Sequence, residues 1–151
     1  MAACSTQLLG VCQASQQGGK EVKYIGKRTP EGCTVSVQGE IGRHPLPRCN
    51  AIRNHSPDGF EWGYGGSGPA QLALALCVHA LGGENVGRER ERALAIYQDF
   101  KWKFIATLPR DTDWEFTLEQ VQKMIAIVEL EQERAKRIAQ AEEERAHENG
   151  R

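Results

Sequence analysis

The sequence has no closely spaced pair of cysteines. Its five cysteines, Cys4, Cys12, Cys33, Cys49 and Cys77, are scattered along the chain, and neither a C-x-x-C nor an H-x-x-x-H spacing occurs. Structural zinc sites and disulfide frameworks depend on such spacing and on paired cysteines. We therefore expect reduced thiols in a cytoplasmic protein, with no metal and no other cofactor.

Long apolar runs and an excess of charge are also lacking. The most apolar stretch, Ala70 to Leu81, contains Gln71 and His79 and is too short to span a bilayer. The N-terminal residues lack the basic region of a secretory signal. A formal net charge of −1 gives no general attraction to nucleic acids or anionic membranes. We therefore expect no membrane association and no direct binding of nucleic acid.

What remains is the composition of one globular domain with two flanking segments. Residues 1–20, rich in Ser, Gln, Gly and Ala, are expected to form a flexible leader. Residues 21–130 have the length of one α+β domain with a modest core. Residues 131–151 combine good helix formers with charge pairs four residues apart. We interpret them as a charged helical extension that frays at its end and is a candidate for self-association.

The fold class predicted for the domain is α+β, a small antiparallel β-hairpin or sheet packed on a three-helix core. Two strand-like runs, residues 22–26 and 33–37, flank a turn and predict the hairpin. Residues 42–59 hold three prolines and predict an irregular loop. The periodicity predicts helices over residues 69–81, 88–106 and 117–130.

Capping signals locate the ends of two of these helices. Pro69 suits the first helical position, with Ser67 or Gly68 as the N-cap. Gly82 suits the end of the same helix. Thr117 and Gln120 have the spacing of a capping box. The first helix is apolar almost all round, so we expect it to be central and buried.

The segment FEWGYGGSGPAQL at residues 60–72 concentrates four glycines just before the first helix. Its G-x-G-x-x-G spacing lacks the βαβ context of a dinucleotide site, and no Walker lysine follows. Pro69 also breaks the G-x-S-x-G pattern of a nucleophile elbow. Two interpretations stay open. In the first, the glycines form a tight corner of the chain that lets aromatic side chains pack over the start of the helix. In the second, they form a binding loop whose N–H groups face a ligand. Under either reading Gly65→Val is expected to lower stability.

Basic and aromatic side chains supply the remaining candidates. A basic cluster before the glycines, formed by Arg43, His44, Arg48, Arg53 and His55, would form an electropositive pocket if it folded beside the helix N-terminus. Trp102 lies off the apolar stripe of its helix, so it either contacts a partner or is covered by another segment. No paired carboxylates or triad spacing supports a catalytic residue. The predicted ligand- or partner-binding residues are Trp62, Tyr64, Gly65, Gly66, Ser67, Arg48, Arg53, His55 and Trp102.

Residues 60–76, FEWGYGGSGPAQLALAL, resemble the signature of an uncharacterised family of small phage, prophage and plasmid proteins, a domain of unknown function. The resemblance covers roughly residues 22–128 and includes KYIG at 23–26, YQDFK at 97–101 and Trp114. It implies no activity for any residue. It implies a mobile-element context, in which small accessory proteins often bind CRISPR effectors or sequester nucleotide immune signals.

From this context we expect a non-enzymatic binding protein in the cytoplasm of a host bacterial cell, which antagonises defence by binding a defence-system protein such as a CRISPR effector. The charged extension and Trp102 favour a protein partner or self-association. The alternative is a sponge for a nucleotide immune signal at the glycine loop, favoured by the basic cluster. A nucleotide-processing enzyme is a further alternative, against which the missing acid–base residues argue.

Overall fold

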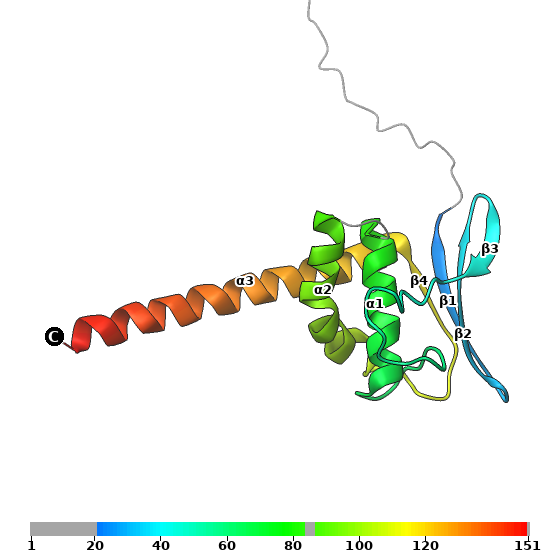
Figure 1. Ribbon diagram of the computed structural model, residues 1–151, viewed down its shortest axis with the longest axis horizontal. Coiled ribbons are helices and arrows are strands. Elements are labelled where there is room, and N and C mark those ends of the chain that lie inside the picture. The colour runs from blue at the N-terminus through cyan, green and yellow to red at the C-terminus, as the bar shows by residue number, and fades with distance from the viewer. Residues whose placement is uncertain (1–20, 84–86, 151) are drawn as a thin grey trace, which may run out of the picture.

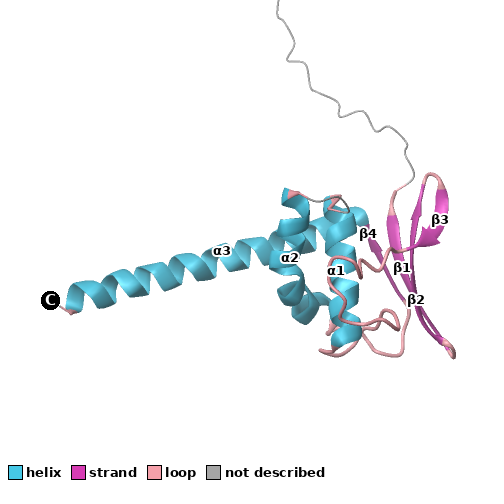
Figure 2. Cartoon of the chain, viewed as in Figure 1, coloured by secondary structure: helices cyan, strands magenta, loops and turns pink. Residues whose placement is uncertain are grey.

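A four-stranded antiparallel sheet and three helices form the computed structural model, which describes residues 21–83 and 87–150. The leader expected over residues 1–20 lies outside the described residues. Helix α1 lies between the sheet and α2, and α3 leads away from this body (Figures 1 and 2). The elements are β1 (Lys23–Thr29), β2 (Gly32–Gly39), β3 (Gly42–Pro45), α1 (Ser67–Leu81), α2 (Arg88–Phe100), the π-helical turn η1 (Lys101–Ile105), β4 (Trp114–Thr117) and α3 (Leu118–Asn149). The predicted α+β class is confirmed.

The predicted hairpin forms the middle of the sheet, whose strand order is β3-β2-β1-β4. Strands β1 and β2 pair from Lys23 with Gln38 to Thr29 with Gly32. The two outer strands were not predicted. Strand β3 occupies the start of the segment expected to be irregular, and β4 pairs with β1, placing Trp114 opposite Gly26. A Cβ at Gly26 would overlap the Trp114 indole, so the glycine admits this ring onto the sheet.

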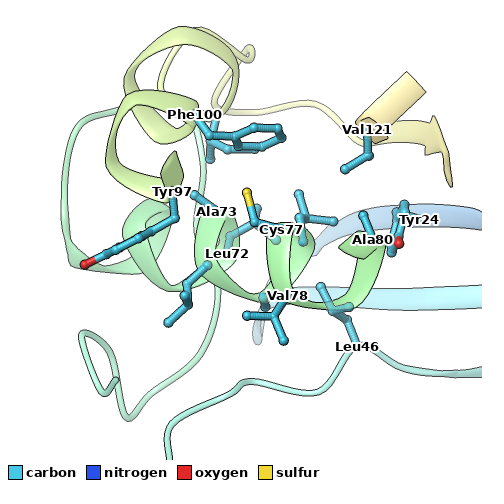
Figure 3. Close-up of a cluster of buried hydrophobic side chains, with 14 of the residues drawn as sticks. Tyr24, Leu46, Leu72, Ala73, Cys77, Val78, Ala80, Tyr97, Phe100 and Val121 are labelled. Carbon is cyan, nitrogen blue, oxygen red and sulfur yellow. The ribbon is translucent and has the colours of Figure 1, made fainter. Parts of the chain in front are cut away.

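Helix α1 is the centre of the core. Almost all of its side chains are buried, and they contact residues of the sheet, α2 and α3 (Figure 3). Its C-terminal cap, Gly82, adopts the left-handed conformation with φ 68°, as predicted. Its start differs from the prediction, because the helix begins at Ser67 with Gly66 as the N-cap and no side-chain cap bond. Pro69 is therefore the third helical residue.

The second helix is interrupted near its end. Helix α2 stops at Phe100, and a π-helical turn over Lys101–Ile105 replaces the continuous helix predicted to residue 106. The amide of Ala106 donates to the carbonyl oxygen of Lys101 at 2.8 Å, the five-residue step of a π-turn. The extra residue shifts the apolar face, so Ile105 is completely buried while Phe104 is only partly buried.

Helix α3 begins with the predicted capping box, in which Thr117 and Gln120 exchange side chain–backbone hydrogen bonds. Val121, Ile125 and Val128 pack into the core. From residue 133 the helix is exposed and extends beyond the body (Figure 1). Within the described residues, no helix has both the length and the apolarity needed to cross a bilayer.

Candidate functional site

The glycines before α1 bring aromatic rings into direct contact with the backbone. A Cβ at Gly65 would overlap the ring of Trp102, and a Cβ at Gly66 would overlap the ring of Tyr64. Gly63, with φ 85°, lies against the backbone of Arg110, where a Cβ would come within 2.6 Å of the Arg110 Cα. We call residues 63–68 together with Lys101 and Trp102 the glycine corner. Its glycines serve close packing, as the reading of a tight corner requires.

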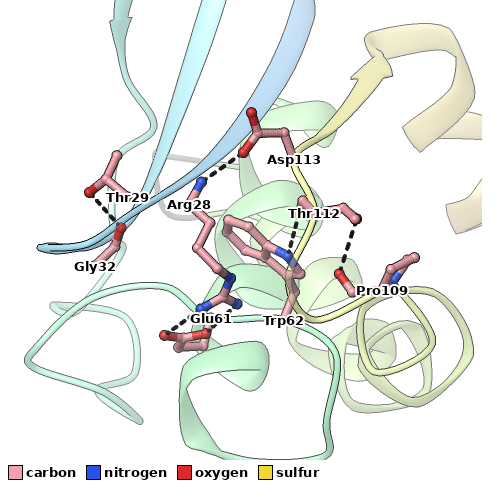
Figure 4. A network of polar contacts seen from close by, with 8 residues as sticks. All are labelled: Arg28, Thr29, Gly32, Glu61, Trp62, Pro109, Thr112 and Asp113. Carbon is pink, nitrogen blue, oxygen red and sulfur yellow. Dashed lines mark hydrogen bonds and ion pairs between the residues drawn. The ribbon is translucent and has the colours of Figure 1, made fainter.

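Trp62 supports this corner from inside. Its side chain is completely buried, and its indole N–H donates to the carbonyl oxygen of Thr112 at 3.1 Å. The guanidinium of Arg28 lies 4.9 Å from the ring centre and donates to Glu61 Oε2 at 2.9 Å (Figure 4). Although Trp62 was predicted to contact a ligand or partner, its burial places it among the residues that hold the corner in place.

The carboxylate of Glu61 is tied to this support. Burial favours its neutral form, but hydrogen bonds from Arg28 and Cys33 outweigh burial and lower the pKa of Glu61. The backbone amide of Arg28 donates to Asp113 Oδ1 at 2.9 Å, which links β1 to the segment before β4. Glu61 is therefore charged and paired at neutral pH, and its carbon atoms pack against Gly68 at the start of α1.

The least expected residue of the corner is Lys101. Its side chain is 7% exposed, and its Nζ lies 4.3 Å from the ring centre of Trp102. Among the described residues it has no carboxylate partner and no hydrogen bond. In the part of the chain that the structure describes, its Nζ is not one of the buried polar atoms that lack a partner, so the packed stem of Lys101 carries an ammonium that still reaches water. Lys101 was not among the predicted binding residues, because a lysine in a helical segment normally indicates a solvated position.

Two residues of the predicted basic cluster lie beside Lys101. Arg53 donates to the hydroxyl oxygen of Tyr97 at 3.1 Å, and His55 Nε2 lies 2.8 Å from the same oxygen. Burial, the charge of Arg53 and the charge of Lys101 together lower the pKa of His55. A neutral imidazole can accept a hydrogen bond from the Tyr97 O–H at Nε2. We call Arg53 and Lys101, together with the neutral His55 beside them, the cationic group.

Gln71, a residue of α1, holds the loop over residues 48–56 by hydrogen bonds to its backbone. It is completely buried, and its Oε1 accepts hydrogen bonds from the amides of His55 at 2.7 Å and Ser56 at 3.3 Å. Its Nε2 donates to the carbonyl oxygens of Arg48 and Arg53. One side chain thus satisfies four backbone groups of an irregular loop. A lone glutamine in an otherwise apolar helix was the sequence signal for this role.

The structure therefore brings most of the predicted site residues to one place. Tyr64 and Gly65 precede α1, Gly66 is its N-cap and Ser67 its first residue. The amide of Gly63 donates to the carbonyl oxygen of Ile105, which joins the corner to η1. Trp102 is 59% exposed and Tyr64 is 38% exposed. No acidic residue occupies the first turn of α1, so the positive end of the helix dipole is not offset there.

Arg48 belongs to a different surface. Its guanidinium donates to the carbonyl oxygen of Pro57 at 3.0 Å and borders a pocket of about 390 Å³ between β2, β3 and the following loop. Val35, Leu46 and Phe60 give this pocket apolar walls. Cys33 also lines it, and burial together with the nearby Glu61 raises the pKa of its thiol to about 11. This thiol is therefore a weak nucleophile at neutral pH.

The chemistry available at the glycine corner is that of anion and π-face binding. Cations and a helix N-terminus attract phosphate or carboxylate groups, and exposed indole and phenol rings offer surfaces for stacking. Within residues 21–83 and 87–150, no group of three or more His, Cys, Asp or Glu side chains is placed to hold a metal ion. His55 is the titratable residue of the cationic group, and its lowered pKa keeps the imidazole neutral at neutral pH.

Comparison with known proteins gives a family assignment. Comparison with curated proteins and comparison with solved structures yield no match. The model of DUF6166, a family of unknown function, matches residues 24–127, which include the sheet except for Lys23, α1, α2, the glycine corner and α3 as far as Ile127. The resemblance inferred from the glycine-rich signature agrees with this match at the level of a domain of unknown function. The chain belongs to the DUF6166 family.

Proposed function

We propose that the protein binds a phosphorylated small ligand, a nucleotide, at the glycine corner without converting it chemically. The observation that carries this proposal is Lys101, whose stem is buried and whose ammonium has no carboxylate partner among the described residues. A phosphate group bound beside it would pair with this cation through charge-assisted hydrogen bonds. Arg53 and His55 add two further donors.

The neighbouring rings favour a ligand that also carries a flat π system. Trp102 is more than half exposed although its ring packs on Gly65 and lies over Lys101 Nζ. Tyr64 is held by Arg110, whose guanidinium carbon lies 5.0 Å from the ring centre. Exposed aromatic rings beside cations bind nucleobases by stacking while the cations bind phosphates. A nucleotide carries both groups, a phosphate for the cations and a base for the aromatic rings.

The biological role proposed for this binding follows from the resemblance to proteins of phages, prophages and plasmids. In a host bacterial cell, a protein that holds a nucleotide immune signal lowers the free concentration of that signal. Non-enzymatic sequestration of this kind needs only affinity and abundance, and it does not need acid–base residues at the ligand. The proposal therefore places the protein as a nucleotide sponge that antagonises host defence.

Binding is tested by native mass spectrometry of the purified protein and by titration with mono-, di- and cyclic nucleotides. We expect a retained or titratable nucleotide, and a loss of affinity of at least tenfold in Lys101→Met. Lys103→Met is the matched control, because Lys103 lies in the same turn but pairs with Glu131 at 2.6 Å. Equal affinity in Lys101→Met and the parent contradicts the proposal. If the nucleotide is chemically converted on long incubation, the proposal of binding without conversion is wrong and the enzyme alternative holds.

A protein target is the second candidate, and Trp102 also favours it. The indole borders a shallow pocket of about 420 Å³ between η1 and α3, whose wall includes Asp99, Lys103, Val128 and Glu131. Exposed tryptophans with charged neighbours are frequent anchors of protein interfaces. In this case the target is a defence-system protein such as a CRISPR effector, inhibited by occlusion.

The two candidates separate by experiment. A defence protein that co-purifies with the parent but not with Trp102→Ala favours the second candidate, provided that Ile41→Ala still retains it. Ile41 is 94% exposed on the sheet side and serves as the matched apolar control. The first candidate is favoured if Trp102→Ala loses nucleotide binding and no defence protein co-purifies with the parent.

A further inference from the structure

The free part of α3 is the largest feature that neither candidate function uses. The last side-chain contact of the helix with the body is made by Gln132, whose Nε2 donates to the carbonyl oxygen of Ala95 and to Asp99. Residues 133–149 then continue as exposed helix for about 25 Å. Figure 1 shows this free segment extending away from the sheet and from the other helices.

An unsupported helix of this length is only marginally stable in water. The charge order of the free segment weakens it further, because the acidic run Glu142–Glu144 lies in its C-terminal half, where negative charge opposes the helix dipole. Its one ion pair joins Arg137 and Glu133 at 3.1 Å. Among the described residues, neither the acidic run nor Arg134 and Lys136 has an ion-pair partner.

The unpaired charges are arranged in two blocks of opposite sign. A basic block, Arg134 with Lys136 and Arg137, precedes the acidic run. Ala139 lies midway, three residues from both Lys136 and Glu142. The same count holds further out, where Arg134 and Glu144 are equally distant from Ala139. The free segment is therefore complementary to its own reverse.

We propose that the free segments of two copies of this protein pair antiparallel about a two-fold axis beside Ala139. Each basic block then faces the acidic run of the other copy, and the cations of the partner offset the unfavourable charge near each C-terminus. A parallel pair would instead place like charges level with each other. The charge order thus selects both the partner, a second copy, and its orientation.

Apolar contact between the copies is limited but is centred on the same axis. Ile138 is 51% exposed and adjoins Ala139. Leu130, 70% exposed, and Ile127, 43% exposed, lie on the same helix face towards the body. Such an interface is small and mostly charged, so the dimer is weak and sensitive to salt. This inference does not depend on the proposed ligand, because the glycine corner lies outside the free segment.

The first test is sedimentation of the full chain over a range of protein and salt concentrations. We expect a monomer–dimer equilibrium in about 50 mM salt, and at least a tenfold weaker association in about 500 mM salt, where screening is shorter than the charge spacing. A protein that stays monomeric at several hundred micromolar in low salt overturns the proposal. So does a dimer whose affinity is independent of salt.

Charge-reversal variants test the pairing itself. One variant changes Glu142, Glu143 and Glu144 to Lys, and the other changes Arg134, Lys136 and Arg137 to Glu. Each variant alone is expected to be monomeric, and an equimolar mixture is expected to form a heterodimer because the blocks are again complementary. Circular dichroism of each variant checks that the body remains folded. A mixture that stays monomeric although both variants are folded contradicts the proposal.

Orientation is tested with single cysteines introduced at exposed positions. Ala139→Cys lies at the axis and is expected to form an intermolecular disulfide under mild oxidation. Ala146→Cys is the matched control, since antiparallel pairing holds its two copies far apart, beyond disulfide reach. Mass mapping separates these links from any made by the native cysteines. Rapid linking of Ala146→Cys with none of Ala139→Cys indicates another arrangement and overturns the proposal.

Discussion

The indole of Trp102 occupies the space that a side chain at Gly65 would need. The contact joins the loop before α1 to the π-helical turn after α2, and it keeps Trp102 beside Lys101 Nζ at 4.3 Å from the ring centre. Gly65 is not among the residues with positive φ, so close packing, and not backbone conformation, requires a glycine here. The candidate site therefore depends on the absence of a side chain at Gly65 as much as on the side chains of Trp102 and Lys101.

Gly65→Ala is expected to lower the free energy of unfolding by about 1–3 kcal/mol, the usual cost of forcing extra atoms into a packed contact. Chemical denaturation measures this change. Gly39→Ala is the matched control, because its Cβ would meet only Val22 at an ordinary 3.6 Å. Equal stability of the parent and Gly65→Ala, with Trp102 still in place, would show that the indole does not need the glycine.

Arg28→Met is expected to destabilise the protein by about 1–3 kcal/mol, because it leaves the partly buried Glu61 carboxylate without its partner. The folded-state pKa of Glu61 is lowered against burial by the hydrogen bonds from Arg28 and Cys33. The resulting stability is present above the unfolded pKa of Glu61 and is lost as pH falls through the folded pKa.

Urea unfolding of the parent and Arg28→Met from pH 7 down to pH 3 measures both effects. The difference between the two proteins is expected to shrink towards acid. Lys27→Met is the control, since Lys27 makes an exposed pair with Asp113, and such pairs contribute about 0–1 kcal/mol. A difference that stays constant down to pH 3 contradicts the assigned role of Glu61.

Gln71→Leu is expected to cost about 2–4 kcal/mol, although it replaces a buried polar side chain by an apolar one of similar size. Four backbone groups of the loop over residues 48–56 lose their hydrogen-bond partner, and unsatisfied buried groups cost about 1–3 kcal/mol each unless water reaches them. Hydrogen exchange of the His55 and Ser56 amides gives the local readout. Unchanged protection of both amides would contradict the role given to Gln71.

His55 is expected to titrate below its ordinary pKa in the free protein, because of burial, Arg53 and Lys101. A histidine whose folded pKa is depressed contributes stability that is complete above its unfolded pKa, near 6.5, and is lost as pH falls through the folded pKa. Lys101→Met removes one cause and is expected to raise the pKa of His55.

NMR titration of the His55 ring protons in the parent and in Lys101→Met measures this shift, with Lys103→Met as the control of equal charge change. Saturating nucleotide is expected to raise the pKa of His55 in the parent, since a nearby phosphate favours the imidazolium. A ligand that binds without moving this pKa does not bind beside the cationic group.

The sequence by itself determined the elements that depend on local patterns. The buried helix α1, its left-handed cap at Gly82 and the capping box at Thr117 follow from apolar runs and short-range hydrogen bonding. Alternation on either side of a turn was enough to identify the β1–β2 hairpin. The glycine-rich segment was also recognisable as the loop before a buried helix, because four clustered glycines do not favour a regular helix or strand.

Only the tertiary structure decided which distant residues meet. Strand β4 spans Trp114–Thr117, too few residues for a periodic signal, and its Trp114 ring packs where Gly26 has no side chain. The π-turn buries Ile105 and leaves Phe104 only partly buried. The stem of Lys101 is buried, with its Nζ 4.3 Å from the ring centre of Trp102, although the position of this lysine in a helical segment indicated a solvated side chain. Local propensity reports hydrogen bonds a few residues apart, whereas burial and charge at a site depend on side chains brought together by the whole fold.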